Sequence, residues 1–221
     1  MTHPSPVHKV LEMVRTGQIT KEQGDELLAA LAGEPHPLSR WLFTPSERLS
    51  LRASLAIGAL VAVLSATIML LHVHFDGPLD VHLVKRALPV HEILVEQILV
   101  WPFLATVLWA AARLTERKGR FVDFLAHTGV ARTPMLLAGV GALALYRGLE
   151  RLPWGALSQK AGLAGFGWAI LCTAWFIALL YQGYRNASGG RGIRAVVTFV
   201  LALVTTEVLG EIVLAAVAPH A

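Results

Sequence analysis

The sequence predicts an all-α, polytopic membrane protein with five transmembrane helices and a small helical hairpin ahead of them. The chain of 221 residues is 55% hydrophobic and its mean hydropathy is +0.57, values that do not suit a soluble domain of this length. The apolar residues gather in five stretches separated by charged loops. In a bilayer each stretch must satisfy its own backbone hydrogen bonds, as an α-helix does. The predicted segments are a hairpin over 1–35, a linker and interfacial segment over 36–50, and a transmembrane domain over 51–221.

The N-terminal segment predicts a pair of short helices. Apolar residues recur at helical spacing up to Val14, and Gly17 interrupts the pattern. Thr20 and Gln23 form a capping box that starts a second helix. So small a hairpin buries little apolar surface. Residues 6–33 are therefore expected to contact a cytoplasmic partner protein, a second copy or the bilayer, or to cap the membrane domain.

A family pattern is visible in the same segment. From Gly17 the chain follows the order Gly–x–Ile–Thr–x–Glu–x–x–x–x–Leu–Leu, which ends at Leu28. This order resembles the short bacterial SHOCT-like module, which often lies beside membrane spans. The resemblance implies a cytoplasmic helical hairpin attached to a membrane domain.

Four of the five apolar stretches can cross a hydrocarbon core about 30 Å thick, which needs about 20 helical residues. The third is short and must borrow residues from its flanks. The first helix is expected to begin near Pro45, with Thr44 as its cap and Glu47 closing a capping box. The stretches are Leu51–Leu71, Ile93–Leu114, Thr133–Tyr146, Ala161–Tyr181 and Ala195–Ala218.

The distribution of positive charge predicts the orientation. With the N-terminus inside, the inside segments 1–52, 113–132 and 182–194 hold 14 of the 19 Lys and Arg residues. This excess predicts a cytoplasmic N-terminus and an outward C-terminus. Because the basic residues lie at span ends, the positive net charge does not indicate a nucleic-acid partner. The single cysteine, Cys172, excludes an intramolecular disulfide and is expected to be a buried thiol.

The membrane domain resembles the bacterial branch of the Yip family, the five-span proteins named for interaction with Ypt/Rab GTPases. The likeness rests on Gly119-x-Phe121-x-x-x-Leu125-x-x-x-Gly129, on Pro134 entering a span, on a Trp-rich fourth span, and on Gly190-x-Gly192-x-x-Ala195 before the last. It implies five helices, an inside N-terminus and an outside C-terminus. It implies no catalytic residue. The chain lacks the Asp-Leu-Tyr-Gly-Pro motif of the eukaryotic relatives, so GTPase binding is not implied.

Three acidic residues fall inside predicted spans, where a carboxylate costs a few kcal/mol unless it has a partner. Glu207 and Glu211 are four residues apart, on one helical face. Glu96 and Arg147 lie at similar depth, which predicts a polar cluster of Glu96, Glu211 and Arg147 with Glu207 beneath it. Three interpretations stay open: a proton or cation path, a groove for a lipid headgroup, or an internal ion pair that fixes helix packing.

The loop after the first span is rich in histidine. His72, His74, Asp76 and His82 are candidate ligands for zinc or copper, because imidazole and carboxylate suit both ions. The alternatives are a pH-responsive loop, since histidine titrates near neutrality, and ordinary interfacial histidines without a ligand.

The loop between spans two and three mixes basic and aromatic residues and predicts a surface for anionic lipid or a partner protein. Its alternative is an ordinary basic inside loop. The residues of this predicted surface are Arg117, Lys118, Arg120, Phe121 and Phe124.

Taken together, these patterns favour a non-enzymatic membrane-organising or adaptor protein that self-associates and contacts partners or lipid. Gly58 and Ala62 permit close helix contact, and no motif of an intramembrane enzyme is present. The alternative is a transporter, channel or lipid scramblase that uses the intramembrane glutamates. It ranks second because the sequence shows neither an inverted repeat nor a plainly broken helix.

Overall fold

The structure is a computed structural model in which two compact units, Met1–Leu42 and Phe43–Ala221, are distinguished and described separately. It describes residues 6–32, 42–45, 48–75, 77–83, 89–115, 117, 119–149 and 156–217. Residues 29, 30, 32, 146–149, 156–162 and 217 are described by their main chain.

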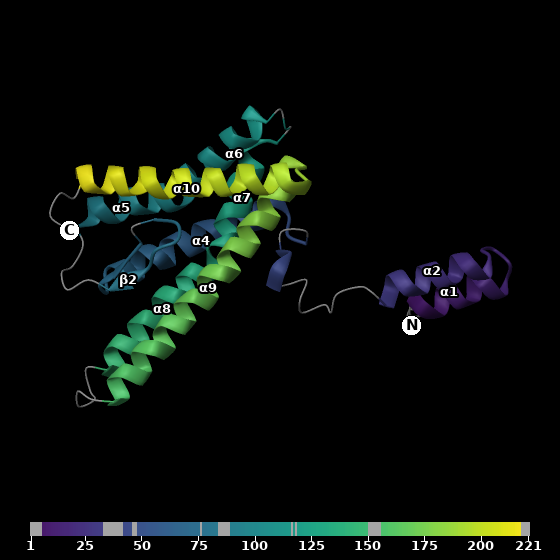
Figure 1. Cartoon of the computed structure of the whole chain (residues 1–221), viewed down its shortest axis with the longest axis horizontal. Coiled ribbons are helices and arrows are strands. Elements are labelled where there is room, and N and C mark those ends of the chain that lie inside the picture. Colours follow the sequence, from purple (N-terminus) through teal and green to yellow (C-terminus); the bar gives the residue numbers. More distant parts are fainter. Residues whose placement is uncertain are drawn as a thin grey trace. The chain divides into compact units, whose positions relative to one another are not determined.

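The first unit is a helical hairpin, as the sequence predicts. Helices α1 (Pro6–Arg15) and α2 (Lys21–Ala32) lie side by side (Figure 1). The Thr20 N–H donates to Oε1 of Gln23 at 3.0 Å, and the Gln23 N–H donates to Oγ1 of Thr20 at 3.3 Å. This reciprocal pair confirms the capping box, which satisfies amide groups that the start of a helix leaves unpaired.

The second unit confirms the all-α, multi-pass membrane fold. In the described part of the chain, five helical stretches are long and apolar enough to cross a membrane: Leu51–Met69, Val90–Leu114, Phe121–Leu145, Leu163–Ser188 and Gly192–Ala216. They contain α4 (Leu51–Met69), α5 (Val90–Ile98), the π-helix η2 (Leu99–Phe103), α6 (Leu104–Leu114), α7 (Phe121–Ala131), α8 (Thr133–Leu149), α9 (Ala156–Ser188) and α10 (Gly192–Val217). Figure 1 shows α8 beside α9, and α10 beside α5 and α6.

The third span takes in residues from the flank of its apolar stretch, as expected, and runs over Phe121–Leu145, 25 residues. The predicted inside segment 113–132 was wrong from Phe121 onward, because those residues belong to the span. Pro134 interrupts the helix without ending the span, because the N–H groups of Met135 and Leu136 both donate to the Arg132 carbonyl at 3.0 and 3.1 Å. Arg132 therefore lies within a span.

The first span begins later than predicted. Ser50 caps α4 by accepting the Ala53 N–H at 3.2 Å, and Leu51 is the first helical residue. Pro45 belongs to a separate turn, where its carbonyl accepts the Arg48 N–H at 3.1 Å. The expected start near Pro45 was wrong because this turn is not continued into α4.

The second span contains a break that the sequence analysis missed. Between α5 and α6 the helix widens to a π-helical turn, η2, with Pro102 inside it. Proline supplies no N–H to the helical ladder and its ring crowds the preceding turn, so a local change of pitch is the expected response. The span thus changes pitch a few residues after Glu96.

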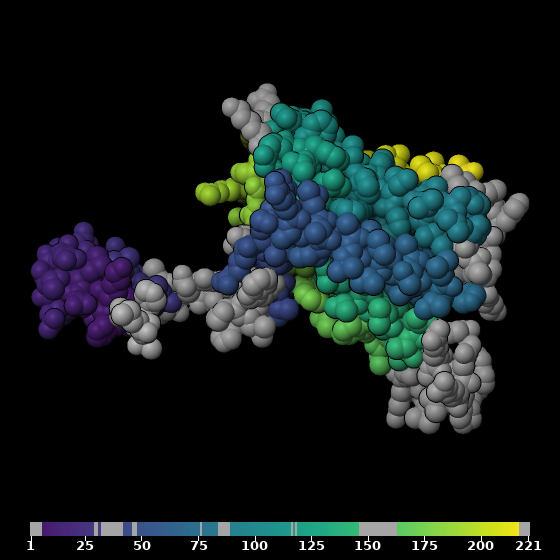
Figure 2. All heavy atoms as spheres, turned by 180° about the vertical axis from the view of Figure 1, so that it is seen from behind, coloured from purple at the N-terminus to yellow at the C-terminus, as the bar shows by residue number. Residues whose placement is uncertain are grey.

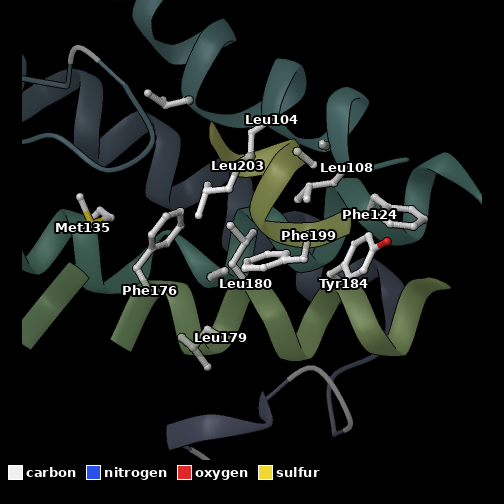
Figure 3. Close-up of a cluster of buried hydrophobic side chains, with 14 of the residues drawn as sticks. Leu104, Leu108, Phe124, Met135, Phe176, Leu179, Leu180, Tyr184, Phe199 and Leu203 are labelled. Carbon is white, nitrogen blue, oxygen red and sulfur yellow. The ribbon is translucent and has the colours of Figure 1, made fainter. Parts of the chain in front are cut away.

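The helices α6, α7, α9 and α10 share a buried apolar core (Figure 3). Leu104 of α6, Phe199 of α10 and Phe176 of α9 are each at most 3% exposed. Figure 3 shows the core side chains of these three helices lying against one another. The hydrophobic effect does not drive helices together in lipid, so dense packing of this kind supplies much of the stabilisation between them.

Close contact between α4 and α7 depends on two glycines. A Cβ at Gly58 would lie 2.9 Å from the Cα of Gly129 and 2.8 Å from the Trp101 ring. Trp101 also donates its indole N–H to the Leu125 carbonyl at 2.9 Å. The close helix contact expected at Gly58 is therefore made within the chain.

One face of α4 remains apolar and uncovered. Leu60, Val63 and Leu64 are 56%, 63% and 42% exposed, and Figure 2 shows α4, in blue, along the surface of the second unit. Exposed apolar residues on a helix of this composition suit contact with lipid tails.

Candidate functional site

A short β-hairpin follows α4 and folds onto the helices. Strands β1 (Val73–His74) and β2 (His82–Leu83) pair antiparallel, with Val73 opposite Leu83 and His74 opposite His82. Val73 is 0% exposed and the adjacent Phe75 is 1% exposed. The hairpin therefore contributes side chains to the protein core.

Glu96 of α5 holds the hairpin by two contacts. Its Oε2 accepts the main-chain N–H of Phe75 at 3.0 Å, and its Oε1 lies 3.1 Å from Nδ1 of His74. Glu96 is 1% exposed and His74 is 4% exposed. Burying a carboxylate is costly, and donors at both of its oxygens offset that cost.

Two further titratable groups extend from His74 toward the surface. The rings of His74 and His82 are stacked at a centroid distance of 5.5 Å and an angle of 23°. Nδ1 of His82 lies 3.3 Å from Oδ2 of Asp80, and both side chains are nearly half exposed. The hydrogen bond from His82 holds the pKa of Asp80 below its usual value, against the opposing effect of partial burial.

Arg132 meets the same hairpin from the break between α7 and α8. Its guanidinium donates to Oε1 of Gln97 at 3.1 Å and lies 5.7 Å from the centre of the Phe75 ring. Arg132 is 3% exposed. The sequence analysis placed Arg132 in a loop. The apolar residues on both sides of Arg132, from Phe121 to Leu145, could have indicated that it lies within a span.

Glu207 of α10 reaches the turn of the hairpin. A Cβ at Gly77 would lie 2.7 Å from Oε1 of Glu207 and 2.9 Å from Oε2. The carboxylate therefore rests directly against the Gly77 main chain, a close approach that requires glycine. Glu96 and Glu207, from two different helices, contact hairpin positions only two residues apart.

We call this group the hairpin site; it comprises His74, Phe75, Gly77, Glu96, Arg132 and Glu207. It contains two of the four residues of the predicted polar cluster, Glu96 and Glu207. Glu211 is exposed, one turn beyond Glu207 on α10. The side chain of Arg147 lies outside the described residues.

In the part of the chain that the structure describes, the predicted metal ligands His74 and His82 lie together with stacked rings, without a third predicted ligand beside them. His72 is exposed with a positive φ of 71°, whereas His74 is buried against Glu96. Asp76 lies outside the described residues. Over those ranges no group of three or more His, Cys, Asp and Glu side chains is placed to hold a metal ion.

The predicted lipid or partner surface is divided by the structure. Phe124 was wrongly assigned to a surface: it is 1% exposed, because it packs against the ring of Tyr184 at a centroid distance of 6.1 Å. Phe121 is 38% exposed. Arg120 pairs with Asp123 at 2.8 Å. Arg117 is partly buried, and Lys118 lies outside the described residues.

Comparisons of this chain with known proteins found no similar protein. No family model, no curated protein and no solved structure matches the chain.

Proposed function

We propose that this protein is a non-enzymatic, multi-pass protein of a bacterial inner membrane that conducts protons through the hairpin site as a transporter or channel. The observation that carries the proposal is the buried pair of Glu96 and His74, at 3.1 Å. Ionisable groups inside a span are costly, and they commonly mark proton paths.

The chemistry requires only proton transfer. A proton taken up at the half-exposed His82 passes to the neighbouring imidazole of His74 through an intervening water, and then from Nδ1 of His74 to Oε1 of Glu96. Each transfer leaves the donor ready to take up another proton. Glu207, against Gly77 on the same hairpin, is the next acceptor.

Two helix interruptions beside the hairpin site support conduction over a purely organising role. The π-helical turn at Leu99–Phe103 follows Glu96 and Gln97 on span two. The break at Arg132 brings that side chain to Gln97 at 3.1 Å. Irregular backbone at membrane depth is tolerated where it lines a protein interior or a cavity.

The second candidate is the membrane-organising adaptor that resemblance to the Yip family implies. The separate N-terminal unit supports it, because Val7, Leu11 and Leu27 on its two helices are 46%, 52% and 42% exposed. These side chains offer an apolar surface to a cytoplasmic partner or a second copy. In this proposal the N-terminus is cytoplasmic, the C-terminus is outside, and the protein self-associates.

Proton flux into liposomes tests the leading proposal. The full chain is reconstituted with a trapped pH-sensitive dye, and a potassium diffusion potential drives proton entry. The chain is expected to acidify the interior faster than protein-free liposomes, and Glu96→Gln is expected to abolish the difference. Glu211→Gln is the control for loss of a carboxylate, because Glu211 is an exposed acid outside the hairpin site.

Two results would overturn conduction. One is a wild-type rate equal to that of protein-free liposomes; the other is an unchanged rate in a folded Glu96→Gln variant. Absence of flux together with a stable oligomer in mild detergent would favour the adaptor.

A further inference from the structure

A basic pocket that shares no residue with the hairpin site lies at the turn between α9 and α10. It has a volume of about 250 Å³ and is lined by Arg185, Asn186, Gly189, Gly190 and Arg191. Spans four and five end and begin at this turn, at Ser188 and Gly192. The pocket therefore lies at a membrane boundary, on the side that the charge distribution predicts to be cytoplasmic.

A third arginine enters from a distant part of the sequence. Arg117, between α6 and α7, lies against Gly190 so closely that a Cβ at Gly190 would overlap its Nη1. That Nη1 atom is buried and donates no hydrogen bond to the residues that the structure describes. A buried guanidinium donor without an acceptor costs free energy, and an anion would supply the missing acceptor.

The positive charge of this pocket is not neutralised by the described residues. None of Arg117, Arg185 and Arg191 forms an ion pair with a described carboxylate. Arg185 instead lies 5.8 Å from the centre of the Tyr181 ring. The nearby acid Asp123 is engaged by both guanidinium donors of Arg120, at 2.8 and 3.0 Å.

The backbone adds to the preference for an anion. Gly189 and Gly192 adopt positive φ values of 67° and 70°, which turn the chain sharply into α10. The first amides of α10 lack intrahelical acceptors and mark the positive end of the helix dipole. Three arginines around a glycine-rich turn at a helix start suit the geometry of a phosphate group.

We propose that this pocket, lined by Arg185, Asn186, Gly189, Gly190 and Arg191 with Arg117 against Gly190, binds the phosphate of a phosphate-bearing anion. A phospholipid headgroup and a soluble phosphate share this chemistry, and the position at a membrane boundary suits the headgroup. The inference is independent of proton conduction, because no residue of the pocket belongs to the hairpin site.

Native mass spectrometry of the full chain in mild detergent tests the inference, with phosphatidylglycerol, phosphatidylcholine and inorganic phosphate as separate probes. Retention of phosphatidylglycerol is expected to fall about tenfold or more in Arg117→Gln, since a charge-assisted hydrogen bond is lost. Gly190→Val tests the same pocket sterically, without a change of charge. Arg52→Gln is the matched control, because Arg52 is an exposed arginine at the start of α4.

The separate probes distinguish a phospholipid headgroup from a soluble phosphate. Binding of phosphatidylglycerol that millimolar inorganic phosphate does not displace supports a lipid headgroup, and binding of inorganic phosphate that Arg117→Gln abolishes supports a soluble ligand. Equal retention by wild type, Arg117→Gln and Gly190→Val would overturn the inference. So would an equal loss in Arg52→Gln, because it would show attraction by net charge alone.

Discussion

Glu96 and Phe75 are joined by a hydrogen bond of 3.0 Å from the Phe75 main-chain N–H to the Glu96 carboxylate, across 21 residues of sequence. The bond fastens the β-hairpin to α5 in the protein interior. His74, the neighbour of Phe75, completes the attachment through the other carboxylate oxygen at 3.1 Å. Stability and the proposed proton transfer therefore depend on the same carboxylate.

Removing His74 should destabilise the membrane domain. His74→Ala leaves the buried Glu96 without its imidazole partner, and loss of one member of a buried pair costs about 3–5 kcal/mol. Unfolding by sodium dodecyl sulfate in mixed micelles measures the change. His72→Asn is the control, because His72 is exposed and asparagine tolerates its positive φ. Equal stability of both variants would show that the pair contributes nothing.

Gly77 and Glu207 should show energetic coupling. Gly77→Ala places a methyl group 2.7 Å from Oε1 of Glu207, and overpacking of this kind costs about 1–3 kcal/mol. Glu207→Ala removes the obstructing carboxylate, so the double variant should recover much of that loss. A double-mutant cycle in the same unfolding assay measures the coupling. Strict additivity would contradict the contact.

Gly58 should tolerate no side chain. Gly58→Ala would bring its Cβ within 2.9 Å of the Gly129 main chain, which cannot move aside as a flexible side chain can. A loss of about 1–3 kcal/mol in unfolding free energy is expected. Gly167→Ala is the matched control on α9, because nothing lies within 4 Å of its Cβ position. A loss of similar size in both variants would indicate a general intolerance of alanine.

The contribution of Asp80 should depend on pH. Its pKa in the folded protein is lowered from 3.8, first by the hydrogen bond from His82. A lowered folded-state pKa gives stability that is present above the unfolded-state value and is lost as the pH falls through the folded-state value. The stability difference between wild type and Asp80→Asn should therefore shrink in acid. Unfolding followed by fluorescence at a series of pH values measures this stability difference.

His82→Phe provides the comparison for that pH series. Phenylalanine keeps a ring beside His74 but removes the partner of Asp80, which should return the Asp80 pKa toward its usual value. The stability change caused by Asp80→Asn, measured in the His82→Phe background, should then lose its dependence on acid pH. An unchanged acid profile in His82→Phe would show that another group holds the Asp80 pKa.

The sequence determined the elements of this protein. Length and hydropathy sufficed for the five spans, because the bilayer demands about 20 apolar helical residues for each. The capping box of Thr20 and Gln23 was also predictable, since its two hydrogen bonds join residues three apart. Where local signals compete, prediction failed. The second span was predicted to pass through Pro102, but not its π-helical turn, and the third was not predicted to extend back beyond the interruption at Pro134.

The hairpin site was decided by the tertiary structure. Local pattern placed Glu96 and Glu207 in spans as acids in need of partners, and tertiary packing brought the hairpin between them. Arg132 and Gln97 are 35 residues apart in sequence and 3.1 Å apart in space. Such pairs depend on which helices pack together and on how a loop folds back, and neither hydropathy nor residue spacing carries that information.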